Sequence, residues 1–331
     1  MIEIGAILRN VIVDERWGGE HGIGRFSTEV IARLEVPWRA LGGNGSPTSI
    51  LDVFGARRAK LPSSAVLYSP GFNAGVTLAR QVLTIHDLIH LQIPSENSLA
   101  KRIYYNQIVK RAIKRAGVVM TVSATSARAI AEWVDAPGVE IVIVGCGRSE
   151  AFAMDGPAAP FDRATFLYVG NLKPHKNIEV LFAALELRQD YSLIVVTSDV
   201  EQAEAAVATA GLADQVSIRT GVSDDELASL YRGAAGALQP SVLEGFGLPV
   251  LEAMACGTRV ASWLGCESVQ EIRGDTGVTV QSATSAEEWG RAMDTLLKQS
   301  AAGPLVMPAA WNERYSWDGV GERVSAAIGR A

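Results

Sequence analysis

Two glutamates and a glycine turn share one short segment, P-S-V-L-E-G-F-G-L-P-V-L-E-A-M-A-C-G at residues 240–257. Seven residues separate Glu244 from Glu252, and the turn Gly245–Gly247 lies between them. An apolar run with helical spacing starts at Leu248, and the proline after it suits the first turn of a helix. Free backbone N–H groups at a helix start can bind an anion or sugar hydroxyls. The segment therefore places one acid before these donors and a second acid about two helical turns after them.

A second segment suited to phosphate binding is G-N-L-K-P-H-K-N at residues 170–177. An apolar strand is expected to end at Gly170, and a helix is expected to begin after the loop. Lys173 and Lys176 then lie at the carboxyl end of a strand, beside a helix N-terminus. A cation that supplies charge, next to backbone donors that supply geometry, suits a pyrophosphate. A solvated loop is the alternative interpretation for Lys173 and His175.

A glycine-rich loop, W-G-G-E-H-G-I-G-R, occupies residues 17–25 and opens a segment with helical spacing. Such loops are common, so the loop alone is a weak signal. Gly22 and Gly24 would let the backbone approach a ligand, and Arg25 would supply charge. A helix-surface position is the alternative for Arg25.

A histidine and an aspartate follow the β-branched segment at residues 83–85. His86 and Asp87 are therefore expected at the carboxyl end of a strand, where α/β proteins bind ligands. His90 follows four residues after His86, but no third ligand has recognisable spacing, so no metal site is expected. A buried histidine with a structural hydrogen bond is the alternative for His86.

Two further strand ends carry polar residues. The segment R-T-G-V at residues 219–222 contains Thr220 and Gly221, just before an expected helix N-cap at Ser223. Ser123 lies at the end of another expected strand. We expect the first pair to offer backbone donors and acceptors, and Ser123 to line the same edge of its sheet.

Short apolar strands alternate with longer helical segments along the chain, a pattern that predicts parallel sheets covered by helices. In the first half, segment 42–64 is rich in Gly, Ser and Pro and is left unassigned. The strands expected there are Ile4–Leu8, Ala65–Tyr68, Val82–Ile85, Val118–Val122 and Glu140–Val144. The helices expected there are Gly24–Leu34, Leu99–Ala116 and Ala124–Val134.

The second half repeats the alternation more clearly, after a turn-rich segment at residues 153–160 that predicts a domain boundary. An amphipathic helix is expected from Trp317 to the end. The strands expected here are Phe166–Gly170, Ser192–Thr197, Val216–Thr220, Gly236–Gln239 and Arg259–Ser262. The helices expected here are Ile178–Leu187, Glu201–Ala210, Asp224–Gly233, Leu248–Cys256 and Ala286–Gln299.

Composition describes a water-soluble protein with two ordinary cores, since 48% of the 331 residues are hydrophobic and 20% are charged. No run of eighteen apolar residues and no signal peptide is found, which favours a cytoplasmic location. The three cysteines are an odd set in apolar or loop contexts and are expected to be reduced thiols.

Charge is distributed unevenly. Residues 1–150 hold 17 Lys and Arg against 13 Asp and Glu, whereas residues 151–331 hold 13 against 23. Six of the basic residues lie between Lys101 and Arg115, interleaved with apolar residues on one expected helix. A basic amphipathic helix of this kind suits a weak peripheral contact with an anionic membrane surface, at the inner membrane face. A solvated helix face is the alternative.

The ordered motifs resemble those of retaining glycosyltransferases with the GT-B fold, in family four of the nucleotide-sugar enzymes, and the resemblance extends over nearly the whole chain. It equates the acid–glycine–acid segment with the family's E-x7-E element. It implies an α/β fold of two Rossmann-like, doubly wound parallel-sheet domains facing a central cleft. The implied domains are residues 1–155 for the acceptor, residues 156–312 for the nucleotide sugar, and residues 313–331 as a helix crossing back to the first.

The resemblance also implies roles for the residues above. Glu244 and His86 would be catalytic, whereas Asp87 and Ser123 would contact the acceptor or line the cleft. One departure is Asn171, which stands where the family often has arginine, so Lys173 would supply that charge. The implied donor-binding residues are Gly22, Gly24, Arg25, Gly170, Lys173, Lys176, Thr220, Gly221, Gly245, Phe246, Gly247, Leu248 and Glu252.

By the same resemblance, the expected reaction moves a hexose from a nucleotide-diphosphate sugar to a glycan, lipid-linked or small-molecule acceptor. The motifs are most similar to those of mannosyl- and rhamnosyl-type transferases of polysaccharide biosynthesis, which favours GDP-mannose as donor and leaves UDP-glucose open. No cofactor and no metal ion are expected, because lysines and backbone amides would replace a divalent cation. No nucleic-acid partner is expected.

Two alternatives remain open at this point. One is a nucleotide-sugar-binding protein with a decayed active site, which the departure at Asn171 keeps in view. The other is a GT-B nucleotide-sugar epimerase, which would need an acid/base set that the sequence does not reveal. For the acid–glycine–acid segment itself, an ordinary strand-to-helix turn with two solvated glutamates is the alternative.

Overall fold

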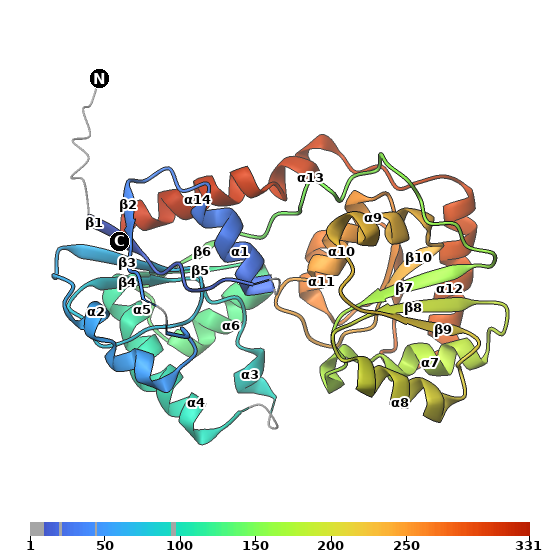
Figure 1. Cartoon of the computed structure of the whole chain (residues 1–331), viewed down its shortest axis with the longest axis horizontal. Helices are drawn as coiled ribbons and strands as arrows, with labels where there is room; N and C mark the ends of the chain where they lie inside the picture. Colours follow the sequence, from blue (N-terminus) through green and yellow to red (C-terminus); the bar gives the residue numbers. More distant parts are fainter. Residues whose placement is uncertain (1–9, 20–21, 44, 94–96) are drawn as a thin grey trace. The chain divides into compact units, whose positions relative to one another are not determined.

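The computed structural model describes residues 10–19, 22–43, 45–93 and 97–331. The chain divides into two compact units, one formed by residues 1–147 with 314–331 and the other by residues 148–313. Each unit contains parallel β-strands flanked by helices (Figure 1). The α/β class expected from the alternating pattern is therefore confirmed.

The strands of unit 1 form a four-stranded parallel sheet in the order β2-β1-β3-β4 and a parallel pair β5-β6. A parallel bridge between Thr84 and Met120 joins the two groups. The strand expected at Ile4–Leu8 lies outside the described residues. The strands are β1 (Asn10–Val13), β2 (Trp38–Ala40), β3 (Ala65–Ser69), β4 (Arg80–Leu83), β5 (Val118–Thr121) and β6 (Glu140–Ile143).

The last helix of the chain belongs to unit 1, where it lies against α1 and β5. Trp317, Val320 and Val324 bury its apolar face. Helix α6 begins at the N-cap Ser123, whose Oγ accepts a hydrogen bond from the N–H of Ser126 at 3.0 Å. The helices of unit 1 are α1 (Gly22–Ile31), the 3₁₀ turn η1 (Ile50–Phe54), α2 (Ala56–Ala59), α3 (Ile89–Gln92), α4 (Leu99–Tyr104), the π-helical η2 (Tyr105–Val109), α5 (Lys110–Ala116), α6 (Ala124–Val134) and α14 (Trp317–Arg330).

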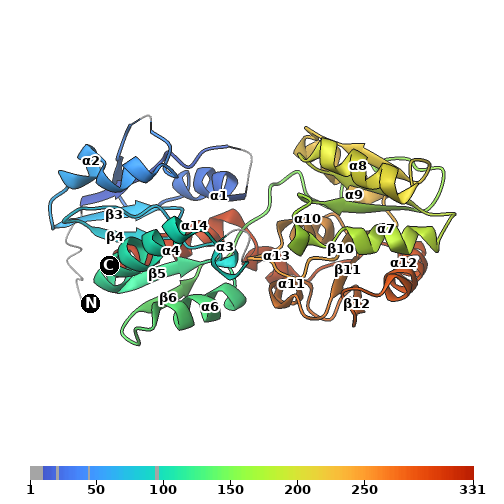
Figure 2. The same ribbon diagram turned by 90° about the horizontal axis from the view of Figure 1, so that it is seen from below.

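The sheet of unit 2 has six parallel strands in the order β12-β11-β10-β7-β8-β9 (Figure 2). In unit 2, β7 comes first in the sequence. Strands β8 and β9 follow on one side of it, and β10, β11 and β12 lie on its other side. The strand order therefore reverses between β7 and β10, which is where doubly wound sheets bind ligands. The strands are β7 (Thr165–Val169), β8 (Ser192–Val196), β9 (Val216–Arg219), β10 (Gly236–Gln239), β11 (Val260–Trp263) and β12 (Val278–Val280).

Two layers of helices cover this sheet. Helices α7, α8 and α12 adjoin one another, as do α9, α10 and α11. The side chains of Phe166, Leu181 and Trp289 are fully buried between the first layer and the sheet. The helices of unit 2 are the 3₁₀ turn η3 (Pro174–Lys176), α7 (Glu179–Glu186), α8 (Val200–Ala210), α9 (Asp224–Gly233), α10 (Leu248–Ala255), α11 (Glu267–Arg273) and α12 (Ala286–Ala301), and α13 (Ala309–Arg314) follows at the boundary.

Some expected boundaries were wrong. The strand expected at Val82–Ile85 occupies Arg80–Leu83, and the helix expected to begin at Gly24 begins at Gly22. The expected helix Leu99–Ala116 contains the π-helical η2. Elements β1, β2, β12, α2, α3, α11 and α13 were not predicted. Apart from β1, these are three-residue strands and one- or two-turn helices, which carry too few residues to establish a period.

A buried network of charges holds the unassigned segment of unit 1 in place. Arg58 of α2 lies 3.2 Å from Asp14, which directly follows β1, and 2.9 Å from Asp52 of η1. Arg16 contacts both carboxylates at 2.6 Å. Burial raises the pKa of Asp52, but the hydrogen bond from Arg16 and the charges of both arginines outweigh it, so the net pKa lies below its usual value. The network thus fixes η1 and α2 against the end of β1.

Candidate active site

The loop after β7 is held by hydrogen bonds on its inner side. The N–H of Leu172 donates to Asp199 Oδ2 at 2.9 Å, and Gln202 Nε2 donates to the carbonyl of Leu172 at 3.1 Å. The turn η3 follows, and Asn177 ends it with a left-handed φ of 55°. This backbone path brings Lys176 to the carboxyl end of the sheet.

The loop after β10 is attached to the loop after β7. The N–H of Val242 donates to the carbonyl of His175 at 2.8 Å. Asn177 Nδ2 donates to the carbonyl of Pro240 at 3.2 Å. Because β7 and β10 are neighbours, these two loops flank the point where the strand order reverses.

Lys176 and Glu244 form an ion pair at this point, with Nζ 2.7 Å from Oε1. Two more donors converge on the same carboxylate oxygen, Gln239 Nε2 at 2.7 Å and Ser241 Oγ at 2.8 Å. The Lys176 and Glu244 side chains are 17% and 10% exposed. Three donors on one oxygen fix the carboxylate, and the remaining exposure leaves the pair accessible to a ligand.

The glycine turn after Glu244 opens helix α10 as expected. Gly247 is the N-cap, with a left-handed φ of 116° that favours glycine, and Pro249 lies in the first turn. A Cβ at Gly247 would also come 3.2 Å from Val269 Cγ2. The carbonyl of Glu244 accepts a hydrogen bond from Ser268 Oγ at 2.8 Å, so α11 supports the turn. Gly245, Phe246 and Leu248 therefore surround a helix N-terminus directly beside the ion pair.

The second glutamate lies deeper. Glu252 is on α10, about one turn after its start, and is 6% exposed. Lys173 is exposed on the same loop as Lys176, next to Gly170 at the end of β7. The backbone thus brings Glu252 and Lys173 to the same edge of the sheet as Glu244.

The loop after β9 lies farther along this edge. Thr220 and Gly221 are exposed, and Gly221 has a left-handed φ of 62°. Ser223 then caps α9 by accepting a hydrogen bond from the N–H of Glu226. Because β8 lies between β9 and β7, Thr220 and Gly221 are not part of the group of side chains around Glu244.

In unit 1, His86 and Asp87 follow β4 after two residues, Thr84 and Ile85. His86 Nε2 lies 3.0 Å from the carbonyl of Pro70, and an Nε2–H tautomer donates to that carbonyl. The His86 ring meets Phe26 edge-on, with centroids 4.8 Å apart. Asp87 Oδ1 accepts a hydrogen bond from the N–H of Ile89 at 2.9 Å, so Asp87 also stabilises the start of α3.

The glycine loop of unit 1 leads into α1, which begins at Gly22. Gly24 is buried, and a Cβ there would lie 2.2 Å from the carbonyl oxygen of Gly19, so only glycine fits. Arg25 is half-buried on α1. Of the loop's other residues, 20 and 21 lie outside the described ranges.

A sequence profile of the family described as "Glycosyl transferases group 1" matches residues 149–313, the region that carries both loops of the ion pair. This half of the chain belongs to that family. The resemblance inferred from the motifs is therefore confirmed for it.

Two curated relatives illustrate the similarity. An O-antigen chain mannosyltransferase of Salmonella typhimurium is 32% identical over 55% of this chain and 52% of its own length. A D-inositol 3-phosphate glycosyltransferase of Acidothermus cellulolyticus is 32% identical over 57% of this chain and 45% of its own. The chain thus spans about half the length of these curated relatives.

Solved structures match over nearly all of the chain. A sucrose-phosphate synthase from Thermosynechococcus elongatus has a TM-score of 0.67, covering 97% of this chain and 95% of that one at 21% identity. An Anabaena protein in complex with UDP-glucose has a TM-score of 0.72, covering 96% and 98% at 14% identity. Identities this low establish the fold alone, and that fold is GT-B, as expected.

Several residues around the ion pair were not predicted. Gln239 and Ser241 hold Glu244, Asn177 joins the two loops, and Ser268 supports the turn. The one signal that could have indicated Gln239 is its amide at the end of an otherwise apolar strand, G-A-L-Q. The others depend on which strands are neighbours, which the sequence pattern does not specify.

The described residues near the ion pair include neither a metal cluster nor a reactive thiol. Among the described ranges, no three His, Cys, Asp or Glu side chains gather as metal ligands. Burial raises the pKa of the Cys256 and Cys266 thiols to about 12, so neither is a thiolate at neutral pH. Cys146 is also buried, and all three cysteines are free.

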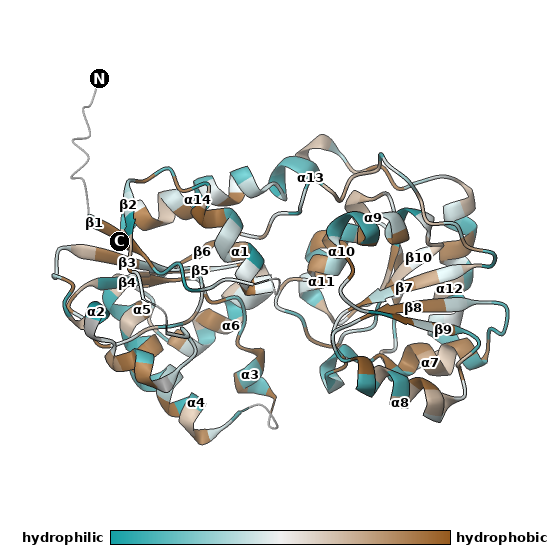
Figure 3. Cartoon of the chain, viewed as in Figure 1, coloured by the Kyte–Doolittle hydropathy of each residue, from teal (hydrophilic) through white to brown (hydrophobic). Residues whose placement is uncertain are grey.

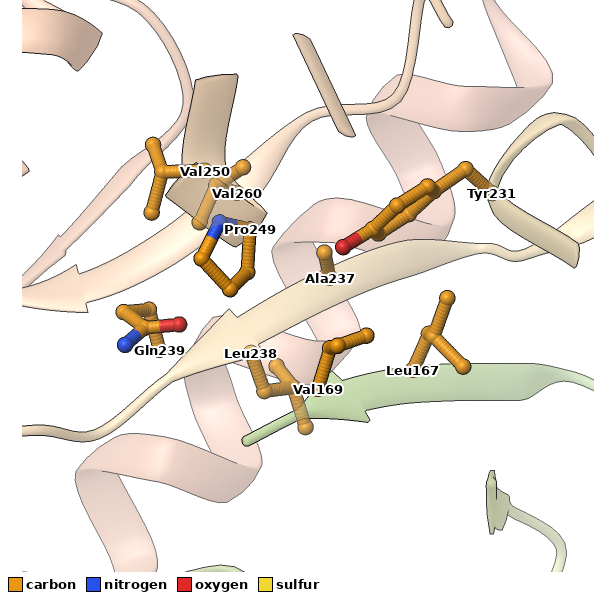
Figure 4. A pocket seen from close by; sticks show the side chains of 9 residues that line it. All are labelled: Leu167, Val169, Tyr231, Ala237, Leu238, Gln239, Pro249, Val250 and Val260. Carbon is orange, nitrogen blue, oxygen red and sulfur yellow. The ribbon is translucent and has the colours of Figure 1, made fainter. Parts of the chain in front are cut away.

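A small cavity lies beneath α10, between β7, β10 and β11 (Figure 4). Its volume is about 10 Å³, and aliphatic side chains together with Tyr231, Gln239 and Pro249 line it. A space of this size holds at most one water molecule, so it is not a sugar pocket.

Proposed function

We propose that this chain is a retaining glycosyltransferase that moves a hexose from a nucleotide-diphosphate sugar to a glycan, lipid-linked or small-molecule acceptor, without a divalent cation. The observation that carries the proposal is the Lys176–Glu244 pair beside the N-terminus of α10, where the strand order of unit 2 reverses. The family match of residues 149–313 supports the reaction class.

The difficult step is the loss of a nucleotide diphosphate from the anomeric carbon. Negative charge develops on the leaving oxygens, while the sugar becomes similar to an oxocarbenium ion, and a preorganised site stabilises both. In our proposal Lys176 and Lys173 hold the diphosphate. Glu244 binds sugar hydroxyls and favours positive charge near the anomeric carbon. Glu252 accepts hydrogen bonds from the ribose hydroxyls.

The ion pair is compatible with donor entry because Glu244 has two further donors. When Lys176 turns toward a phosphate, Gln239 and Ser241 still hold the Glu244 carboxylate at 2.7 and 2.8 Å. The carboxylate then keeps its orientation and its charge for the sugar. His86, fixed by the carbonyl of Pro70, is the proposed hydrogen-bond partner of sugar or acceptor in unit 1.

Retention is proposed to follow a front-face route, in which a donor phosphate oxygen takes the acceptor's proton. A double displacement needs a carboxylate nucleophile at the anomeric carbon. Glu244 is a poor candidate for that nucleophile, because three donors already occupy its Oε1. An inverted product would contradict this route.

Mannose from GDP-mannose is the proposed donor sugar. Several of the curated relatives are named O-antigen or serotype-specific mannosyltransferases, which supports mannose. The Anabaena protein was solved in complex with UDP-glucose, so a UDP-sugar is the donor to compare with GDP-mannose. We propose that the acceptor is a growing glycan or its lipid-linked form, reached at the cytoplasmic face of a membrane. No helix of the described residues has the length and apolar character needed to span a bilayer.

The alternative functions make a different prediction. A binding protein with a decayed site would hold a nucleotide sugar without turnover, and an epimerase would change the sugar without releasing it. Asn171 stands where the family often has arginine, and it is the residue that favours a decayed active site. Its carbonyl accepts a hydrogen bond from Tyr168 Oη at 2.6 Å, which joins the loop around it to β7.

Slow hydrolysis of the donor tests the proposal. The purified chain is incubated for hours with GDP-mannose or UDP-glucose, and the released sugar is followed by NMR. We expect slow release of mannose, and a larger thermal stabilisation by GDP than by UDP, TDP or ADP. Binding with no release of sugar from either donor would contradict a transferase and favour the decayed site.

A further inference from the structure

Exposed hydrophobic side chains concentrate on three segments of unit 1. Among the described residues, twelve large hydrophobic side chains are exposed, and six of them lie on η1, the loop after β3 and α4. Their exposed fractions run from 50% to 81%. Brown, hydrophobic stretches are visible on α4 in Figure 3. The six are Leu51, Phe54, Val76, Leu78, Leu99 and Ile103.

Hydrogen bonds show that the three segments adjoin. The N–H of Val76 donates to the carbonyl of Val53 at 2.7 Å, which joins the loop to η1. The N–H of Ala74 donates to Tyr104 Oη at 2.8 Å, which joins the loop to α4. The guanidinium of Arg115 at the end of α5 donates to the carbonyls of Thr77 and Leu78. The loop therefore lies between η1 and the helical stretch α4–α5.

The same segments are strongly basic. Residues 50–60 and 97–116 contain nine Lys and Arg and a single acidic residue, Asp52. That carboxylate is bound to Arg16 and Arg58, so it does not offset the exposed charges. Since the whole chain has a net charge of −6, the basic character belongs to this region. We call the six exposed apolar residues, together with Lys101, Arg102, Arg111 and Lys114, the docking face.

We propose that the docking face binds the surface of an anionic lipid bilayer. Its apolar side chains enter the boundary between headgroups and acyl chains, while its lysines and arginines meet the anionic headgroups. The apolar side chains favour a bilayer over a nucleic acid or an acidic peptide, which would need charge alone. The inference extends beyond the basic helix 101–115 to η1 and the loop after β3. This inference rests on the proposed function in one respect only, which is that the bilayer would carry the lipid-linked acceptor.

Vesicle sedimentation tests this inference. The full chain is mixed with vesicles of phosphatidylcholine alone or with 30% phosphatidylglycerol, in the absence of any donor. We expect binding to the anionic vesicles. Lys101→Gln with Arg102→Gln should weaken it about 25-fold, since each charge near such a surface contributes about fivefold. Phe54→Ser with Leu99→Ser should weaken it at least about tenfold, and the loss should persist at high salt.

Matched controls lie on unit 2. The double variant Arg291→Gln with Lys298→Gln removes two exposed charges from α12. Val306→Ser removes an apolar side chain that is 70% exposed. Both should leave vesicle binding within about twofold. Thermal unfolding by circular dichroism checks that each variant folds.

Three outcomes would overturn the inference. They are no binding to the anionic vesicles at low salt, equal losses in the control variants, and self-association that Phe54→Ser with Leu99→Ser abolishes. The last would make the face a contact between two copies of the chain. Donor hydrolysis is measured without vesicles, so failure of the proposed reaction and failure of membrane binding are distinguishable.

Discussion

Replacing Glu244 by Gln should lower kcat/KM by about 2–4 kcal/mol, roughly 30- to 1000-fold, and most of the loss should appear in kcat. The amide has nearly the same shape and retains an oxygen that can accept from Gln239 and Ser241. What it loses is the negative charge that favours the oxocarbenium-like sugar, and Lys176 loses its counter-ion at 2.7 Å. Steady-state kinetics of the variant, with thermal unfolding to verify folding, measures this loss.

Glu186→Gln is the matched control, because Glu186 is exposed on α7, away from the two loops. It should leave kcat/KM within about twofold. If Glu244→Gln raised KM and left kcat unchanged, Glu244 would only bind the substrate, and its proposed role in the transition state would be wrong.

Replacing Lys176 by Ala should weaken binding of a nucleoside diphosphate by about 10- to 150-fold and leave nucleoside binding nearly unchanged. A hydrogen bond to a charged group contributes about 1.5–3 kcal/mol, and only the diphosphate meets the ammonium group. Glu244 keeps Gln239 and Ser241 as donors in this variant, so the carboxylate is not left without partners. Isothermal titration calorimetry with the diphosphate and with the nucleoside gives both affinities.

Two further lysine variants are measured in the same experiment, one as a control and one as a second test. Lys298→Ala, on the exposed face of α12, should change neither affinity. Lys173→Ala should weaken diphosphate binding if Lys173 supplies the charge that Asn171 lacks. Equal losses of nucleoside and diphosphate affinity in Lys176→Ala would contradict the assignment of Lys176 to the phosphates.

The sequence predicted the parts of the candidate site that are local. Gly247 and Pro249 mark a helix start by their backbone preferences, and the structure begins α10 there. Lys176 comes one turn after an apolar strand. The pattern of that strand is therefore enough to predict that Lys176 lies at the carboxyl end of the sheet. The repeating strands and helices likewise predicted the parallel sheets.

The contacts between distant segments could not be predicted in this way. The Lys176–Glu244 pair exists because β7 and β10 are neighbours, although β8 and β9 come between them in the sequence. The same strand order separates Thr220 from the pair, although all three residues follow strands. Asp14 and Arg58 meet across 44 residues, and segment 42–64, which carries Arg58, shows no usable period.

The central claim is that an ammonium group and amide dipoles, with no bridging cation, stabilise the charge of the departing diphosphate. The most direct test is the rate of donor hydrolysis or transfer in excess EDTA, compared with the rate in millimolar Mn²⁺ or Mg²⁺. We predict rates equal within about twofold. An enzyme that is inactive in EDTA and regains activity only with Mn²⁺ would contradict the account.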